Sequence, residues 1–377
     1  MEQTIKKIIP VLLFFSLIII QVDAQRILVD GTRFVVNGEE IFMNGVNTPW
    51  HNWNDFGGNY DPSFWDNEFQ RIKEAGGNCA RIWISCDGEV GITIDSTGFV
   101  SGATDAHWRD LDDLFDLAQT HQIYIMATLL SFDHTKSSHK KYNYWRKMIE
   151  NKQNVNYYIS NYLNPFIERY NKNPYLWSID ACNEIEWMHQ DKDNALFDWE
   201  KLQYLAGSMA VAVHLQSKIL FTVGSAAIKW NCNLPEPFEG NKWSDENLQK
   251  LNPSPLARLD FYSPHYYGWV VKWFGNFCTD KTPADYGLTD RPCMVGENPA
   301  QGIFINTALH GDSLAVPIEE AFIKAYENGW KGLMVWTSNG VDTYGSLDEC
   351  GPGLTAFQQK YPDLVTPKIT QKINRKK

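Results

Sequence analysis

The chain has 377 residues, and its 45 acidic and 34 basic side chains give a formal net charge of −11. This balance argues against a nucleic-acid partner, because affinity for phosphate backbones comes mainly from Lys and Arg. There is no internal repeat or low-complexity linker, so the length predicts one large domain.

Residues 1–24 have the pattern of a secretory signal peptide. Lys6 and Lys7 precede an apolar run, and Ala24 supplies a small residue at a cleavage point before Gln25. A membrane anchor is the alternative, but the run Ile8–Ile20 is shorter than the roughly twenty residues that a spanning helix needs. We therefore expect a secreted or periplasmic protein that has no membrane association after cleavage.

The segment that follows, residues 25–367, is expected to form the single domain, with residues 368–377 as a polar, basic tail. The Asn37-Gly38 turn within Ile27–Glu40 predicts a small β-hairpin. Eight short apolar runs then predict strands at Ile41–Asn47, Asn78–Ile84, Ile123–Ser131, Leu176–Asn183, Ile219–Gly224, Leu259–His265, Cys293–Gly296 and Gly332–Trp336. Amphipathic segments between them predict helices at Phe64–Ala75, His107–Gln119, Val155–Asn171, Trp199–Leu215 and Ile318–Asn328.

Alternation of strands and helices predicts parallel pairing, and eight such strands close a (β/α)8 TIM barrel. A doubly wound open sheet is the structural alternative. It requires a Gly-rich phosphate loop after the first strand, whereas Asn47-Thr48-Pro49-Trp50 stands there. The sequence therefore favours an α/β barrel.

Active-site side chains of such barrels lie at the C-terminal ends of the strands. Two glutamates, Glu184 and Glu297, end the fourth and seventh predicted strands, and cleavage of a glycosidic bond needs two carboxyl groups that flank it. Other polar or aromatic side chains at strand ends are Arg81, Asn183, His265, Tyr267 and Trp336.

Taken in strand order, these residues resemble the signature of the clan A glycoside hydrolases, especially family 5. The matching elements are Asn183-Glu184, the His-x-Tyr from His265 to Tyr267, Glu297, Trp336, and Arg81 within Gly77-Asn78-Cys79-Ala80-Arg81-Ile82-Trp83. The resemblance covers nearly all of the mature chain.

The resemblance implies a retaining mechanism in which Glu184 is the acid/base and Glu297 the nucleophile. Glu184 then needs a raised pKa, and the two carboxyl groups should lie about 5–5.5 Å apart. Arg81 and Tyr267 would keep Glu297 ionised, and Asn183 would bind the sugar 2-hydroxyl.

Six further residues have less specific expectations. His265 would hydrogen-bond near the acid or the sugar, and Trp336 would form the floor of the subsite on the non-reducing side. Trp50 is a candidate sugar platform. His134 lies near the position of a family histidine, with a solvent-facing loop residue as the alternative. Glu186 is a rival carboxylate, and Asp180 is expected to be paired within the barrel wall.

The sequence contains 15 Trp residues, and exposed indoles can bind the apolar faces of sugar rings. We expect Trp336 to be exposed on the face that carries both glutamates. At least one of six further indoles should accompany it: Trp50, Trp53, Trp187, Trp230, Trp269 and Trp273.

Seven cysteines follow the predicted signal peptide. Cys79, Cys182 and Cys293 are expected to be buried free thiols, whereas Cys86, Cys232, Cys278 and Cys350 lie in probable loops and could pair. No spacing of His, Cys or Asp resembles a zinc site, and no serine nucleophile elbow is present. We therefore expect no metal and no cofactor.

The N-terminal third most resembles a β-mannanase branch of family 5, through Phe42–Asn47, Asn54-Asp55-Phe56-Gly57, Gly76–Ile84 and Asp95–Gly102. The chain departs from that branch in the third-strand loop and around Asn298-Pro299-Ala300. The resemblance implies an endo-β-1,4-mannanase, with an endo-β-1,4-glucanase or endo-β-1,3-glucanase as alternatives. The expected partner is a β-mannan or β-glucan polysaccharide, bound by a monomer. A non-catalytic carbohydrate-binding barrel would lack Glu184 or Glu297.

Overall fold

The computed structural model describes residues 26–305 and 313–367. The predicted signal peptide and basic tail lie outside these residues. Seven parallel strands form one curved sheet in the order β11-β10-β9-β8-β5-β4-β14. Their bounds are β4 Met43–Asn47, β5 Cys79–Trp83, β8 Tyr124–Thr128, β9 Leu176–Asn183, β10 Leu220–Ser225, β11 Ser263–Pro264 and β14 Gly332–Trp336.

The gap between β11 and β14 is filled by the segment predicted as the seventh strand. Residues 293–299 make isolated parallel bridges to both neighbours, from Cys293 and Glu297 on the β11 side and from Val295 and Pro299 on the β14 side. The predicted barrel is thus confirmed, but this segment is not a continuous strand, and the predicted strand Leu259–His265 is reduced to two paired residues. Prolines at 264, 292 and 299 cannot donate ladder hydrogen bonds.

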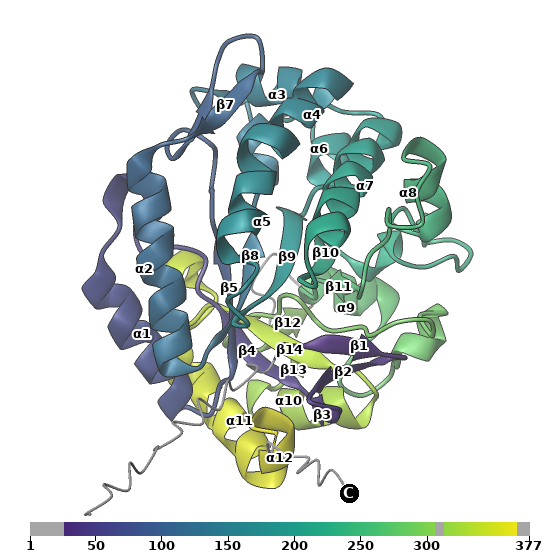
Figure 1. Ribbon diagram of the computed structural model, residues 1–377. Helices are drawn as coiled ribbons and strands as arrows, with labels where there is room; N and C mark the ends of the chain where they lie inside the picture. The colour runs from purple at the N-terminus through teal and green to yellow at the C-terminus, as the bar shows by residue number, and fades with distance from the viewer. Residues whose placement is uncertain (1–25, 306–312, 368–377) are drawn as a thin grey trace, which may run out of the picture.

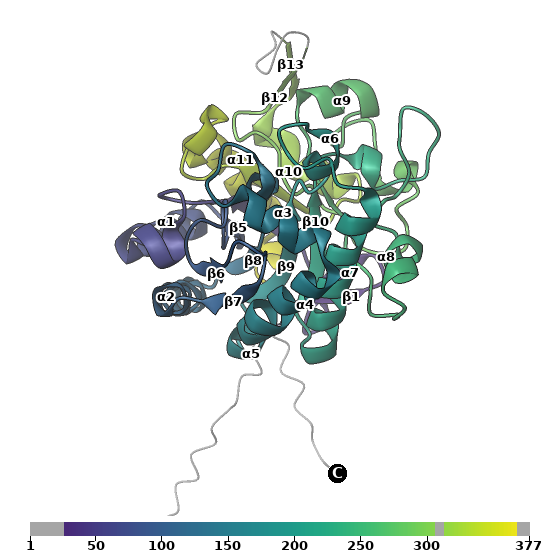
Figure 2. The ribbon, with the colours of Figure 1, turned by 90° about the horizontal axis from the view of Figure 1, so that it is seen from above.

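Helices surround the sheet on the outside of the barrel (Figures 1 and 2). The longer ones are α1 Pro62–Glu74, α2 Asp105–His121, α3 Tyr142–Glu150, α7 Trp199–Gln216, α10 Ile318–Glu327 and α11 Leu347–Lys360. Shorter ones are α4 Lys152–Tyr158, α5 Asn164–Tyr170, α6 Trp187–Gln190, α8 Asp245–Leu251, α9 Gly268–Phe274 and α12 Pro362–Val365. The helix predicted at Val155–Asn171 is α4 and α5 joined by a π-helical turn, Ile159–Leu163.

Two small antiparallel strand pairs lie in the loops that follow barrel strands. The first pairs β6 (Ile92–Ile94) with β7 (Val100–Ala103), and the second pairs β12 (Ile303–Ile305) with β13 (Ser313–Val316). The second pair lies beside α9 (Figure 2). No helix within residues 26–305 and 313–367 is long and apolar enough to cross a membrane.

The N-terminal segment forms a three-stranded sheet, with β1 Leu28–Asp30, β2 Arg33–Val36 and β3 Glu39–Ile41. The predicted hairpin is confirmed as β2 and β3, because Asn37 and Gly38 both adopt the positive φ angles of a type I′ turn. The additional strand β1 was not predicted. Phe34 of this sheet packs edge-on against Trp177 and Phe261, with ring centroids 5.3 and 5.2 Å apart, near the starts of β9 and β11. The sheet therefore covers the end of the barrel opposite the strand C-termini.

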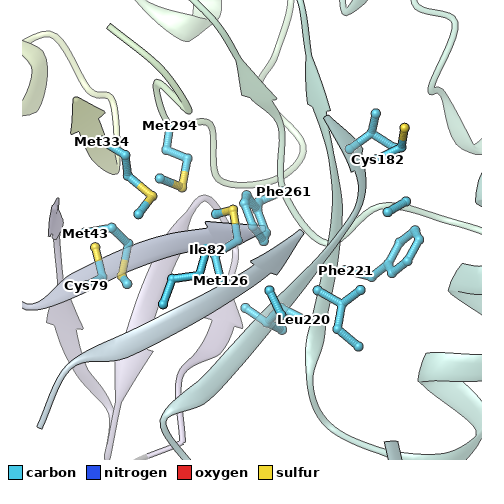
Figure 3. Packing of buried hydrophobic residues seen from close by; sticks show 14 of the residues in the cluster. Met43, Cys79, Ile82, Met126, Cys182, Leu220, Phe221, Phe261, Met294 and Met334 are labelled. Carbon is cyan, nitrogen blue, oxygen red and sulfur yellow. The ribbon is translucent and has the colours of Figure 1, made fainter. Parts of the chain in front are cut away.

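Buried apolar side chains from the barrel strands form the core, including Ile82, Phe261 and Met294 (Figure 3). All seven cysteines are buried and free. The expectation is therefore confirmed for Cys79, Cys182 and Cys293. The four cysteines that could have paired do not form disulfides.

Candidate active site

Glu184 directly follows β9, and its backbone turns the side chain toward the barrel mouth. Its φ angle of 46° is left-handed, and its N–H donates to the carbonyl of Gly224 at 2.7 Å. Oε1 lies 2.9 Å from His265 Nδ1, and Oε2 accepts a hydrogen bond from Trp187 Nε1 at 2.7 Å. Burial raises the pKa of Glu184 to about 7, although 16% of the side chain remains exposed toward the cleft. A carboxyl group of this kind can hold a proton near neutral pH and deliver it to a bound ligand.

Glu186 points the other way. Its Oε1 accepts from Ser225 Oγ at 2.6 Å and from Trp243 Nε1 at 2.7 Å, and its Oε2 accepts from the N–H of Ala226 at 3.0 Å. The side chain is fully buried and does not reach the cleft. Glu186 therefore anchors the loop that carries Glu184. Because its side chain points away from the cleft, it is not a candidate for the catalytic carboxyl group.

Glu297 lies where residues 293–299 bridge β11 to β14. Oε1 accepts from Arg81 Nη1 at 2.6 Å, and Oε2 accepts from the hydroxyl of Tyr267 at 2.6 Å. Burial raises the pKa of Glu297, while electrostatic interactions with His265 and Arg81 and the Tyr267 hydrogen bond act to lower it. Between the two glutamates, Glu297 is the one in contact with a guanidinium, and this contact favours its ionised form.

Arg81 holds several strand ends together while fully buried. Besides Glu297, it donates to Asn47 Oδ1 at 2.9 Å, to Asp180 Oδ2 at 2.8 Å and to Asn183 Oδ1 at 2.7 Å. Asp180 is paired inside the barrel wall, as expected. Because the Asn183 oxygen is occupied by Arg81, the amide N–H of Asn183 is the group that remains to face a ligand in the cleft.

His265 connects the two glutamates. Its Nδ1 is 2.9 Å from Glu184 Oε1 and 3.3 Å from Glu297 Oε2, and burial lowers its pKa to about 4, so the ring is neutral. Both neighbours are carboxyl oxygens, which assigns the single ring proton to Nδ1. One oxygen of each glutamate and a ring nitrogen of His265 all lie within 4.8 Å of one another. The nearest oxygens of the two carboxyl groups are thus closer to each other than the about 6.5–9.5 Å that separates the carboxyl groups of inverting glycosidases.

A cleft of about 960 Å³ opens over both glutamates. On one side, Trp50, Trp53, Trp83, Trp336 and Tyr344 pack together. Three further indoles line the cleft elsewhere, namely Trp187, Trp269 and Trp273. Trp336 lines the cleft together with the glutamates and other indoles, but only 4% of it is exposed, so the prediction that it is exposed is wrong. Of the six further indoles, Trp230 is fully buried, whereas Trp273 is 65% exposed in the cleft.

No family model matches the chain. The sequence is 26% identical to a mannan endo-1,4-beta-mannosidase of Cryptopygus antarcticus over 336 residues, which cover 80% of this chain and 82% of the relative. It is 27% identical to a protein of the same name from Mytilus edulis over 330 residues, or 80% of this chain and 85% of the relative. The solved structure of the Cryptopygus β-1,4-D-mannanase superimposes with a TM-score of 0.76 at 22% identity, over 89% of this chain and 95% of that one.

The chain is thus similar over most of its length to two proteins named mannan endo-1,4-beta-mannosidase, and it shares the fold of a β-mannanase. The resemblance of the strand-end residues therefore agrees with a similarity that extends over most of the chain. The structure brings seven of the predicted residues together around the cleft: Arg81, Asn183, Glu184, His265, Tyr267, Glu297 and Trp336. Trp50 joins them through its contact with Trp336, at 5.9 Å between ring centroids.

His134 is the exception. Its ring is buried against Trp145, its Nε2 lies 3.0 Å from Ser85 Oγ, and it does not line the cleft. His134 is therefore neither a cleft-lining residue nor the solvent-facing loop residue that was the alternative. His134 is the third residue of a short 3₁₀ helix, Phe132–Thr135, and its Nδ1 folds back onto the backbone of Ser131 in a capping box.

Several residues of the cleft were not predicted. Trp83 ends β5 and could have been found by inspecting strand ends. Others lie in the connections between barrel strands, in short elements or irregular segments that the sequence pattern did not indicate, and they include Asp133, Lys136, Asp342, Tyr344 and Phe304.

The hydrogen bond from Trp187 to Glu184 predicts a shift in the pH profile. Trp187→Phe keeps the ring but removes the N–H donor that stabilises the ionised carboxylate, so the pKa of Glu184 should rise above about 7. We expect the basic limb of the kcat/KM profile to move up by about one pH unit, since a hydrogen bond to a charged group is worth roughly that much. Trp108→Phe, on α2 away from the cleft, is the control. An unmoved limb in Trp187→Phe would show that this bond does not set the pKa.

Proposed function

We propose that the protein is an exported, retaining endo-β-1,4-mannanase that uses Glu184 as acid/base and Glu297 as nucleophile. The observation that carries the proposal is the placement of the two carboxyl groups. Their oxygens lie within 4.8 Å at the floor of one aromatic-lined cleft, with His265 between them. This spacing suits direct attack on the anomeric carbon and leaves no room for the intervening water of an inverting enzyme.

In the first step, Glu297 forms a bond to the anomeric carbon as the bond to the glycosidic oxygen breaks. Glu184 gives its proton to that oxygen, and the reducing-end part of the polymer departs. Arg81 and Tyr267 hold the attacking carboxylate from either side at 2.6 Å. In the second step, Glu184 removes a proton from water, which displaces Glu297 and restores both carboxyl groups.

The choice of mannan is supported by the names of the two curated relatives, which are each called mannan endo-1,4-beta-mannosidase. A glucan substrate differs from mannan at the 2-hydroxyl stereocentre, which the amide of Asn183 is placed to contact. A few contacts with the 2-hydroxyl group determine whether the enzyme prefers mannan or glucan.

The test is a product profile on mannan, glucomannan, cellulose, laminarin and xylan, with the anomeric form of the first product followed by proton NMR. We expect internal cuts in mannan and glucomannan, a rapid fall in viscosity, and an initial β-anomer. Turnover of cellulose or laminarin without mannan would overturn the substrate, and an initial α-anomer would overturn retention. Edman sequencing of protein exported by cells would test cleavage before Gln25.

A further inference from the structure

A second pocket, of about 910 Å³, lies on the surface outside the active-site cleft. It forms where the end of α3 and the start of α4 meet the loop that follows α6 (Figure 1). We call it the basic groove, because four cationic side chains line it: Arg146, Lys147, Lys152 and Lys192. Glu150 is the single acidic residue that lines it, so positive charge prevails here in a chain whose net charge is −11.

The four cations of the basic groove form no ion pair with a carboxylate within residues 26–305 and 313–367. Arg146 donates to two backbone carbonyls at 2.8 and 2.9 Å, and Lys147 donates to a third at 2.7 Å. Lys152 lies over the ring of Tyr204, at 4.5 Å from the centroid. Lys192 makes no polar contact within the described part of the chain. The positive charge of the groove is therefore not neutralised by the protein.

The other arginines of the chain are placed differently. Apart from Arg26 and Arg146, every described arginine forms an ion pair with an Asp or Glu. Arg26 is largely buried and donates to backbone carbonyls. In a chain with an excess of acidic side chains, a group of unpaired cations at the surface attracts an anionic ligand to that place.

Side-chain amides and one apolar side chain line the same groove. The amide N–H groups of Asn143 and Asn151 donate no hydrogen bond within the described residues, so they can bind hydroxyl or carboxylate oxygens. Leu196 is 53% exposed and has a left-handed φ angle of 51°. Such a conformation is strained for a residue other than glycine, and strain of this kind gathers at binding sites. An exposed aliphatic side chain can contact the C–H face of a sugar ring.

The short 3₁₀ helix Phe132–Thr135 separates the basic groove from the active-site cleft. Asp133 and Lys136 line the cleft, whereas Arg146 donates to the carbonyl of Thr135 at 2.8 Å from the side of the groove. The cleft and the groove share no lining residue. A ligand in the groove therefore leaves both glutamates accessible to a second polysaccharide chain.

We propose that the basic groove binds a linear acidic polysaccharide, a polyuronate, at the same time as the cleft holds its substrate. Carboxylates of the polyuronate pair with the lysines and Arg146, and its hydroxyls bind the amides of Asn143 and Asn151. A polyuronate carries one negative charge per sugar. Nucleic acid is more densely charged, and the net charge of −11 opposes its approach.

Binding in the groove holds the enzyme on a material in which acidic and neutral polysaccharides are mixed. The attachment raises the concentration of the neutral polymer near the cleft without any new contact to it. The inference goes beyond the proposed function and does not depend on it, because binding of the polyuronate is measured without turnover.

The test is isothermal titration calorimetry of the protein with hexagalacturonate. We expect saturable binding that weakens as salt is raised from about 20 mM to about 500 mM. Saturating mannohexaose should leave it unchanged, because the neutral sugar occupies the cleft. Combining Lys147→Gln, Lys152→Gln and Lys192→Gln should raise the Kd about tenfold or more, since three exposed charge contacts are lost. Hydrolysis of soluble neutral mannan by this triple variant should stay at the wild-type rate.

The matched control combines Lys172→Gln, Lys324→Gln and Lys360→Gln, which remove the same charge from surface lysines outside the groove. Its Kd should change less than twofold. An equal loss in the control would overturn the site, because net charge alone would then explain the binding. Thermal melts report the folding of each variant. Should the groove triple variant fail to fold, Lys192→Glu removes no contact within the described residues and should still weaken binding several-fold.

Three further outcomes would overturn the proposal. The first is no binding of hexagalacturonate at low salt. The second is displacement of hexagalacturonate by mannohexaose, which would place the acidic sugar in the cleft. The third is equally tight binding of a poly-aspartate peptide with the same number of charges, which would show that the groove recognises acidic charge and not a polysaccharide.

Discussion

Glu297→Gln should reduce kcat/KM by about four orders of magnitude or more on every substrate, because an amide cannot attack the anomeric carbon. The loss should not depend on the leaving group, since no glycosyl-enzyme intermediate can form. The fold should persist, because Arg81 keeps its contacts to Asp180 and Asn183, and Tyr267 can still donate to the amide oxygen. The measurement is steady-state hydrolysis of both polymer and activated aryl glycoside, together with a thermal melt.

Glu186→Gln is the informative comparison, because it makes the same substitution at a buried carboxyl group that contacts Ser225, Ala226 and Trp243 and does not line the cleft. The amide would place an N–H group against donors from Ser225, Ala226 and Trp243. We expect a lower melting temperature with turnover retained. If Glu297→Gln kept substantial activity while Glu186→Gln lost it, the nucleophile would have been misassigned.

The catalytic groups could be predicted from sequence because the barrel converts strand ends into neighbours. Arg81, Glu184 and Glu297 are far apart in the chain. Arg81 lies within β5, Glu184 directly follows β9 and Glu297 lies in the bridging segment 293–299, and the barrel brings all three together. The order of the strands was therefore enough to predict that these three side chains lie close together. The hydrogen bonds at 2.6–2.7 Å that fix the orientation of each carboxyl group were not encoded in any such pattern.

Local chemistry explains where sequence reasoning failed. His134 follows a strand at a plausible position, but a capping box turns its ring inward, and this depends on the backbone of a single helical turn. The predicted strands at residues 259–265 and 293–296 are reduced to a two-residue strand and isolated bridges, and the apolar pattern of these runs gives no sign of that. Trp273 could be proposed as a platform, but only the turn of α9 places it beside Trp269.

In contrast to Glu297→Gln, the activity lost in Glu184→Ala should depend strongly on the leaving group. On polymer, where the departing sugar needs a proton, activity should fall by about two to four orders of magnitude. An aryl glycoside whose leaving group departs unaided should still glycosylate Glu297, so that a burst of the phenol is followed by slow turnover. The burial that raises the pKa of Glu184 to about 7 is what makes this side chain the proton donor in the intact protein.

Added azide should then restore turnover of the activated substrate in Glu184→Ala, because it is a nucleophile that needs no base. The alanine leaves room beside Trp187 and His265, the two groups that contact the missing carboxyl. Azide displaces Glu297 from the anomeric carbon, and two successive displacements give a β-glycosyl azide. Near-normal activity of Glu184→Ala on polymer would place the acid/base elsewhere. Azide rescue of a Glu297→Ala variant with an α-azide product would reverse the two roles, because that product arises from a single displacement.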